Sequence, residues 1–311
     1  MTKFIFVANR LWNYLNIYFL KPFDAINDTL TASLLKEHNW EKPYLEIGSG
    51  DGMFSYIMHG GKFPIWFDRY LDIDLNKEDI FDTHVDDKNT SLKKIHDIKN
   101  LCAVDSKENH VKKIKEIGFA DKAILSKYEK LPFSNESFDA LFLYTPHGLD
   151  NYDKCIQECN RTLSTNGNMI VLNFNKKIKN YFICHNLSRL VKGNLTNYFK
   201  RLDNGRHNEI INLSKSLDEW HVYFKKFGFK VIDYNQGLNP IAWMFYDIQT
   251  RPFLKTLIKF FNIFPKNFRT ILKLFWMIVW YPFLLIFYIF FSNSFIKSKK
   301  NCYYSFLLQK V

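Results

Sequence analysis

The sequence predicts an α/β protein built on a doubly wound, mostly parallel sheet, and two observations carry this prediction. Short apolar runs alternate with helical stretches from residue 44 onward, and a glycine-rich turn follows the first run directly. Strands that alternate with helices form a parallel sheet covered on both faces. We expect seven strands, at residues 44–47, 101–104, 123–125, 138–144, 169–174, 229–234 and 303–308.

Two helices are expected before the first strand, at residues 4–20 and 24–39. The first is aromatic and apolar, with one lysine ahead of it and no small-residue cleavage site behind it. A signal peptide is therefore not expected, and we predict a helix that lies against the domain or a membrane surface. The first strand runs into Gly48, Gly50 and Gly52, which is typical of a strand, a tight turn and a helix.

The later helices and one interruption complete the pattern. Helices are predicted at residues 108–117, 152–163 and 217–227, each next to a predicted strand. Residues 62–100 break the alternation with a polar, aspartate-rich stretch, which we interpret as an insertion. Its Asp68, Asp72 and Asp74 are expected to be solvated loop carboxylates.

Composition limits the function classes. The chain has 311 residues, of which 47% are hydrophobic and 24% charged, and a mean hydropathy of −0.23. These values exclude a disordered chain and a polytopic membrane protein. Five scattered cysteines do not form a disulfide framework and favour a reducing compartment.

The net charge of +12 is unevenly distributed. The last acidic residue is Asp247, whereas residues 251–311 contain ten lysines and arginines. A nearly neutral body with a basic, aromatic C-terminal part favours an anionic membrane surface as partner, and no nucleic acid is expected.

The glycine turn has a spacing that matters for its ligand. A dinucleotide-binding turn has the pattern G-x-G-x-x-G, but position 53 is Met53 and the third glycine is Gly52. Glu46, just before the turn, would repel a phosphate and favours a positively charged ligand.

Four motifs, in order, resemble one family over residues 40–175. The segment Glu46-Ile-Gly-Ser-Gly-Asp-Gly52 resembles motif I of the class I S-adenosylmethionine-dependent methyltransferases, and Val104-Asp105-Ser106 resembles the end of their second strand. Glu129-Lys-Leu-Pro-Phe133 followed by Ser137-Phe-Asp-Ala-Leu141 is similar to the signature of the type 11 methyltransferase group. The segments 158–163 and 166–167 resemble the helix and turn before the fifth strand.

The resemblance implies a Rossmann-like, seven-stranded sheet whose last strand is antiparallel, and S-adenosylmethionine as cofactor. It also implies that Asp105 holds the ribose hydroxyls and that the segment after the fourth strand faces the methyl group. Lys127 stands where many members have aspartate, so adenine contacts are expected from the backbone of Tyr128 and Glu129. The expected cofactor-binding residues are Glu46, Gly48, Ser49, Gly50, Gly52, Asp105, Ser106, Tyr128, Glu129 and Tyr144, and no metal site is expected.

The acceptor is less well defined. Residues 144–150 lack the Asn/Asp-Pro-Pro-aromatic motif of amide and adenine N-methyltransferases. His147 is a candidate general base for a hydroxyl acceptor, the alternative being a structural histidine. Arg206 and His207, in a predicted acceptor cap at 175–215, are candidates to bind a phosphate or carboxylate, the alternative being a solvated turn.

Residues 275–291 form an uncharged run of 17 residues that contains Pro282. A helix of this length spans roughly 26 Å, less than the ~30 Å of a bilayer core. Because residues 303–308 are expected in the sheet, both ends of the run belong on one side of a membrane. We predict an in-plane or re-entrant helical hairpin bent near Pro282, on the cytoplasmic face; a single span is the alternative.

We therefore divide the chain into N-terminal helices (1–40), a methyltransferase domain (41–250), a membrane-associated helical insertion (251–300) and the final strand (301–311). The expected function is O-methylation of a lipid-linked saccharide or another lipid-associated acceptor. The alternatives are a methyltransferase of a soluble small molecule or protein, and a non-enzymatic membrane-bound module with a relict cofactor fold.

Overall fold

The fold is taken from a computed structural model. It describes residues 2–36, 44–71, 73–77, 79–82, 101–144, 149, 151–249, 253–292, 295–296 and 300–311, without the side chains of 203–206.

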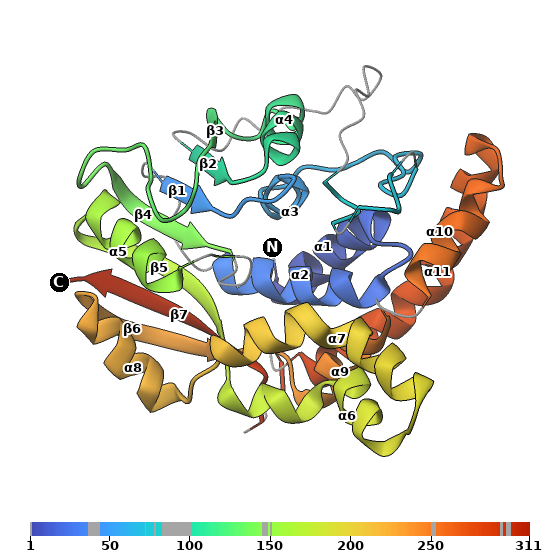
Figure 1. Ribbon diagram of the computed structural model, residues 1–311. Helices are drawn as coiled ribbons and strands as arrows, with labels where there is room; N and C mark the ends of the chain where they lie inside the picture. Colours follow the sequence, from blue (N-terminus) through green and yellow to red (C-terminus); the bar gives the residue numbers. More distant parts are fainter. Residues whose placement is uncertain are drawn as a thin grey trace.

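A seven-stranded sheet forms the centre of the molecule, with the strand order β3-β2-β1-β4-β5-β7-β6 (Figure 1). The strands are β1 (Tyr44–Ile47), β2 (Leu101–Asp105), β3 (Lys122–Leu125), β4 (Phe138–Leu143), β5 (Leu163–Phe174), β6 (Phe229–Gln236) and β7 (Tyr303–Lys310). β1 to β5 are parallel, and β7 pairs antiparallel with both β5 and β6. The seven strands, their doubly wound order and the antiparallel last strand confirm the fold predicted from the sequence.

Side chains on the two faces of the sheet enter two separate cores. In β1, Tyr44 belongs to the core formed with the N-terminal and C-terminal helices. Leu45 and Ile47 belong to the other core, with residues of α5 (Tyr152–Thr162) and α8 (Leu217–Lys226). This alternation is the period of two expected for a strand buried on both faces.

The N-terminal helices are α1 (Lys3–Ile17) and α2 (Pro22–Leu35). Both begin one or two residues earlier than predicted and end three or four residues earlier. Pro22 begins α2, where a missing backbone N–H costs nothing. Both helices pack against α11 (Lys266–Phe291), which follows α9 (Pro240–Gln249) and α10 (Leu254–Asn262) (Figure 1).

The C-terminal apolar run is part of one continuous helix, because α11 extends through Pro282. The predicted hairpin bent at Pro282 is therefore wrong. The helix is held on both sides of the proline: Trp276 Nε1 donates 2.8 Å to the carbonyl of Phe19, and Tyr288 OH donates 3.2 Å to Ser33 Oγ. These contacts offset the helical hydrogen bond that proline cannot make.

The predicted acceptor cap is helical. It contains a 3₁₀ helix, η1 (Lys176–Tyr181), followed by α6 (Ile183–Leu190) and α7 (Asn194–Asn212). Residues 202–207 lie inside α7, so the alternative of a solvated turn at this place is wrong.

The described part of the predicted insertion packs on the helices. Asp68 is nearly buried and pairs with Arg269 of α11, so the prediction of a solvated carboxylate is wrong for this residue. Asp74 accepts a hydrogen bond from the backbone of Asn76, and Asp72 lies outside the described residues.

Candidate active site

The strand order predicts a ligand crevice at the carboxyl ends of β1 and β4. These strands are neighbours, and the chain leaves them toward opposite faces of the sheet, to α3 (Met53–Met58) and to α5. In doubly wound sheets, ligands bind outside the carboxyl ends of strands at such a switch point. The residues just beyond β1, its neighbour β2 and β4 are Gly48, Ser106 and Tyr144.

The glycine turn lies on the end of β2. The backbone of Gly48 donates 2.9 Å to the carbonyl of Val104, and the backbone of Gly50 donates 2.9 Å to Asp105 Oδ2. Ser49 is buried, and its Oγ donates 3.3 Å to the carbonyl of Glu46.

Two glycines of the turn have different roles. Both have positive φ, +58° for Gly50 and +78° for Gly52. A Cβ on Gly52 would come within 2.5 Å of the Phe119 ring, whereas a Cβ on Gly50 would meet nothing within 4 Å. Gly52 therefore allows close packing against Phe119, and Gly50 leaves open space in front of the loop that a ligand can occupy.

Glu46 lies beneath the turn and is fully buried. Its Oε1 accepts a hydrogen bond of 2.5 Å from Ser55, and its Oε2 has no partner among the described residues. Burial raises the pKa of Glu46 to about 7, although the bond from Ser55 opposes this shift.

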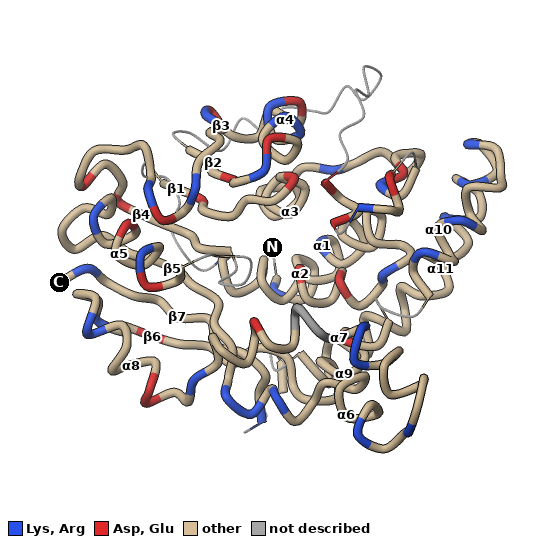
Figure 2. Tube along the Cα trace, viewed as in Figure 1, with Lys and Arg blue, Asp and Glu red and all other residues tan. Residues whose placement is uncertain are grey.

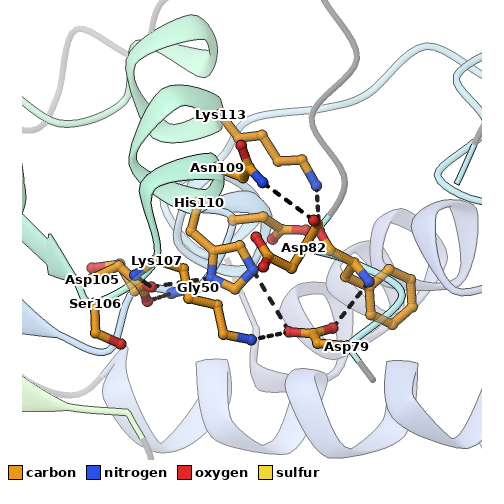
Figure 3. A network of polar contacts seen from close by, with 12 residues as sticks. Gly50, Asp79, Asp82, Asp105, Ser106, Lys107, Asn109, His110 and Lys113 are labelled. Carbon is orange, nitrogen blue, oxygen red and sulfur yellow. Dashed lines mark hydrogen bonds and ion pairs between the residues drawn. The ribbon is translucent and has the colours of Figure 1, made fainter. Parts of the chain in front are cut away.

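Asp105 ends β2 and is the centre of a polar network (Figure 3). Its Oδ2 accepts from the backbone of Gly50 and, at 3.2 Å, from Tyr128 OH. Its Oδ1 accepts from the backbone of Lys107 at 2.9 Å and lies 3.1 Å from His110 Nδ1. The sequence analysis missed His110, although it lies in the first turn of α4 (Glu108–Ile117), directly after the recognised motif.

The insertion contributes a second carboxylate to this network. Asp79 pairs with Lys107 Nζ and lies 3.8 Å from His110 Nε2, so His110 lies between two acidic residues (Figure 3). Backbone and side-chain bonds, led by the bond from Lys107, lower the pKa of Asp79 despite its partial burial. Residues 79–82 therefore lie over the N-terminal end of α4, next to Asp105.

The two residues predicted to contact adenine have different surroundings. Tyr128 is buried, its OH accepts 3.2 Å from the backbone of Ser106, and burial raises its pKa. Glu129 is turned toward α5, where its Oε1 accepts 3.0 Å from the backbone of Asn151. The structure thus brings Tyr128 to Asp105 through its phenol.

Tyr144 lies where β4 meets the glycine turn. Its backbone N–H donates 3.2 Å to the carbonyl of Ile47, and its ring packs on Phe54 with centroids 4.7 Å apart. Its OH donates 2.9 Å to Oδ1 of Asp28, a residue of α2. The sequence analysis missed Asp28; two aspartates four residues apart in an otherwise uncharged helix were the available signal.

The predicted acceptor residues are less closely tied to this crevice. His147 lies outside the described residues, as does the side chain of Arg206. His207 stacks on His185 of α6, with ring centroids 3.8 Å apart and an interplanar angle of 11°. Its described ring contacts are therefore within the helical cap.

Comparison with known sequences supports the family resemblance over part of the chain. Residues 88–171 match a family model described as a methyltransferase domain. The chain carries a class I S-adenosylmethionine-dependent methyltransferase domain. It is therefore an enzyme of the methyltransferase type, and S-adenosylmethionine is its cofactor. No curated protein sequence matches the chain.

Several solved methyltransferase structures resemble the chain at low identity. A putative sarcosine dimethylglycine methyltransferase from Galdieria sulphuraria is 13% identical, with a TM-score of 0.46, covering 91% of this chain and 84% of that one. A possible histamine N-methyltransferase from Thermotoga maritima is 13% identical, with a TM-score of 0.47 and coverage of 94% and 93%. A putative methyltransferase from Bacillus halodurans C-125 is 13% identical, with a TM-score of 0.44 and coverage of 90% and 96%.

The residues at the crevice fit this cofactor. The open space before Gly50 admits a ligand close to the backbone, and the orphaned Oε2 of Glu46 is a buried acceptor under the turn. Asp105 suits the ribose hydroxyls, because two of its hydrogen-bond partners are side chains that can give way, Tyr128 and His110. The residues that would hold the cofactor are Glu46, Gly48, Ser49, Gly50, Gly52, Asp105, Ser106, Tyr128, Glu129 and Tyr144.

The cofactor supplies a methyl group already activated on a positively charged sulfur. The protein's part is then to align the acceptor and to exclude water, with a proton acceptor added where the nucleophile is weak. Near the glycine turn, Tyr144 follows β4 and its phenol is hydrogen-bonded to the Asp28 carboxyl group.

Proposed function

We propose that this methyltransferase acts at the cytoplasmic face of a membrane and methylates a hydroxyl of a lipid-linked saccharide or another lipid-associated acceptor. The observation that supports the proposal is the two-sided character of α11. One side of this helix is fixed to the domain, and the other presents large apolar side chains to the surroundings.

The outer side of α11 is apolar along most of its length. Phe275 is 67% exposed and Ile278 57% exposed. The exposed apolar residues of α11 are Phe268, Ile271, Leu274, Phe275, Ile278, Val279, Phe283, Ile286 and Phe290. Soluble proteins rarely expose large contiguous apolar patches, and such patches mark surfaces that bind a membrane or another protein.

The inner side of α11 ties it to the body of the protein. Lys273 Nζ donates 2.5 Å to the carbonyl of Phe67 near one end, and Tyr281 OH donates 3.0 Å to the carbonyl of Ala8 in the middle. At the other end, the carbonyl of Phe291 accepts 3.2 Å from the backbone of Asn239. By length and composition, α11 is able to cross a bilayer. These contacts favour a helix that lies in the plane of the membrane surface instead, with its outer side in the lipid.

Charge favours an anionic surface. Lys255 and Lys259 lie on α10 and Lys266 begins α11, and neither helix contains an acidic residue (Figure 2). Each lysine near anionic headgroups contributes roughly 1 kcal/mol, which salt weakens. Each large apolar side chain contributes about 1.5–3 kcal/mol when it is fully removed from water, so apolar burial is the larger part.

The position of the crevice supports a lipid-linked acceptor. α2 packs against α11 and also carries Asp28 to Tyr144. Packed helices have axes about 8–10 Å apart, so roughly one helix layer separates the proposed membrane surface from the crevice. The reacting group would thus belong to the head of a lipid rather than to its apolar part.

Vesicle binding tests the membrane part of the proposal. Wild-type protein should co-sediment with vesicles of phosphatidylglycerol and phosphatidylcholine and should stay bound in high salt. The double variant Phe275→Ser/Ile278→Ser should lose most of this binding. The matched control Leu190→Ser/Val222→Ser removes exposed apolar residues of α6 and α8 and should bind normally. Equal binding by both double variants would contradict the proposal.

A further inference from the structure

Asp28 reaches the switch point of the sheet from outside the methyltransferase motifs. Its Oδ1 accepts the hydroxyl hydrogen of Tyr144 at 2.9 Å. Tyr144 in turn is bonded through its backbone to Ile47, the last residue of β1. The length of the Tyr144 side chain therefore separates the carboxyl group from the carboxyl ends of β1 and β4, where a doubly wound sheet binds its ligands.

One oxygen of Asp28 is unused. The residue is 3% exposed, and its Oδ2 has no hydrogen-bond partner among the described residues. Buried polar atoms nearly always have partners, so an orphaned carboxyl oxygen near a ligand-binding edge points to a ligand group. The complementary group is a hydrogen-bond donor, such as a hydroxyl.

The other aspartate of α2 shows the contrast. Asp24 lies one turn earlier and is also buried, but Lys21 pairs with it and Gln249 Nε2 donates 3.2 Å to its Oδ1. Residues that pack around α2 thus provide partners for the Asp24 carboxyl group, whereas Oδ2 of Asp28 has none among the described residues.

We propose that Oδ2 of Asp28 binds the reacting hydroxyl of the methyl acceptor and takes its proton, which makes Asp28 a catalytic residue. The proposal rests on the hydroxyl acceptor of the proposed function. As the acceptor oxygen bonds to the methyl carbon, the carbon–sulfur bond breaks and its electron pair stays on sulfur. The hydroxyl proton passes to Oδ2, so the charge of the sulfonium is lost and Asp28 becomes neutral.

The electrostatics of the site suit this role. Burial raises the pKa of Asp28 to about 7, while hydrogen bonding from Tyr144 and, more weakly, from Tyr18 opposes the shift. A general base is most effective when its pKa is near the working pH. The charged and titratable groups that face Asp28 are Tyr144, Asp24, Tyr18, Arg69, Tyr14 and Tyr303.

The kinetic experiment uses the full-length protein, tritiated S-adenosylmethionine and a whole extract of cells that lack the protein. Asp28→Asn should lower turnover at saturating cofactor at least 100-fold and should leave cofactor affinity, measured by calorimetry, within about twofold. Asp28→Glu should recover part of the rate. The matched control Asp24→Asn should keep most of the wild-type rate at pH 8, where Asp28 is ionised with or without the Asp24 charge that raises its pKa.

A second measurement does not depend on turnover. Infrared difference spectra of the protein should show two carboxyl groups that titrate near pH 7, Asp28 and Glu46, of which Asp28→Asn lacks one and Glu46→Gln the other. Tyr144→Phe should move the Asp28 titration to higher pH, because it removes a bond that stabilises the carboxylate. The pH profile of turnover should shift in the same direction.

The outcomes separate this proposal from the proposed function. A tritiated product, separated from unreacted cofactor and found in the aqueous or protein fraction rather than in lipid, would contradict the membrane acceptor but not the role of Asp28. Wild-type turnover by Asp28→Asn would overturn the role of Asp28, whichever fraction is labelled. If no labelled product forms, the infrared titration decides, and a neutral-range carboxyl signal that is unchanged in Asp28→Asn would overturn the proposal.

Discussion

Arg269 of α11 donates its Nε hydrogen to Oδ2 of Asp68 at 2.8 Å, although the two residues are 201 positions apart in the sequence. Both side chains are nearly buried, at 2% and 7% exposed. The pair joins the apolar C-terminal helix to the segment after β1, next to the glycine turn. The side of α11 that carries Arg269 is therefore packed against the domain and cannot face lipid.

Breaking this pair should destabilise the protein. Arg269→Met leaves the Asp68 carboxylate buried without its cation, which we expect to cost about 3–5 kcal/mol of unfolding free energy, measured by urea denaturation. The double variant Asp68→Asn/Arg269→Met should recover most of the loss. Lys259→Met, on the exposed side of α10, is the control and should change stability by less than about 0.5 kcal/mol. An equal loss in the single and double variants would contradict the pairing.

Gly50 should be required for cofactor binding but not for folding. Gly50→Ala places a methyl group in the open space before the loop, and we expect at least a tenfold weaker binding of S-adenosylmethionine by calorimetry. Gly118→Ala is the matched control, because Gly118 also has positive φ (+68°) and its Cβ would make an ordinary contact, 4.0 Å from the carbonyl of Lys115. Both variants should lose about 1 kcal/mol of stability from backbone strain. Equal cofactor affinity in the two variants would count against the loop as the binding site.

The buried carboxyl of Glu46 should make stability depend on pH. Its folded pKa is about 7, against an ordinary value of 4.5 for glutamate, so between these pH values the folded protein holds a proton that the unfolded chain releases. The unfolding free energy of the wild type should therefore fall as pH rises through this window, by up to about 3 kcal/mol. Glu46→Gln lacks this contribution.

The measurement is the difference in unfolding free energy between the wild type and Glu46→Gln at several pH values. Asp28 is present in both proteins, so its own titration cancels. Relative to Glu46→Gln, the wild type should lose up to about 3 kcal/mol of unfolding free energy between pH 4.5 and pH 7. Above pH 7 the difference between the two proteins should stay constant. A difference that does not change with pH would show that Glu46 is ionised when folded throughout the range.

Much of the sheet could be predicted from the sequence, because local patterns determine it. β1 was predicted at its observed bounds, and α4 likewise, since an apolar run before glycines and an amphipathic stretch before Gly118 are local signals. The antiparallel position of β7 followed from the family resemblance. Pro282 was misjudged because a local rule about proline was applied to a helix whose tertiary contacts lie on both sides of it.

The part of the site that could not be predicted from the sequence depends on long-range contacts. Asp28 meets Tyr144 across 116 positions, and Asp79 meets Lys107 across 28, so no local spacing indicates either contact. Asp68 was expected in solvent because a polar stretch with several aspartates usually forms a solvated loop. Its partner lies on α11, and only the packing of that helix brings the two together.

The position of the C-terminal strand relative to the membrane is the most decisive test of the in-plane arrangement. All five native cysteines are buried, including Cys302, so labelling Cys302 itself is not informative. Val311 is 80% exposed, and a cysteine added after it should be accessible. Because β7 lies between β5 and β6, this cysteine should be on the cytoplasmic side. A membrane-impermeant maleimide should not label it in intact cells but should label it after lysis, while an exported cysteine-containing protein serves as the positive control. Labelling from outside would mean that α11 crosses the bilayer. In that case β7 could not pair in the sheet, and Arg269, Tyr281 and Tyr288 could not make their contacts with the domain.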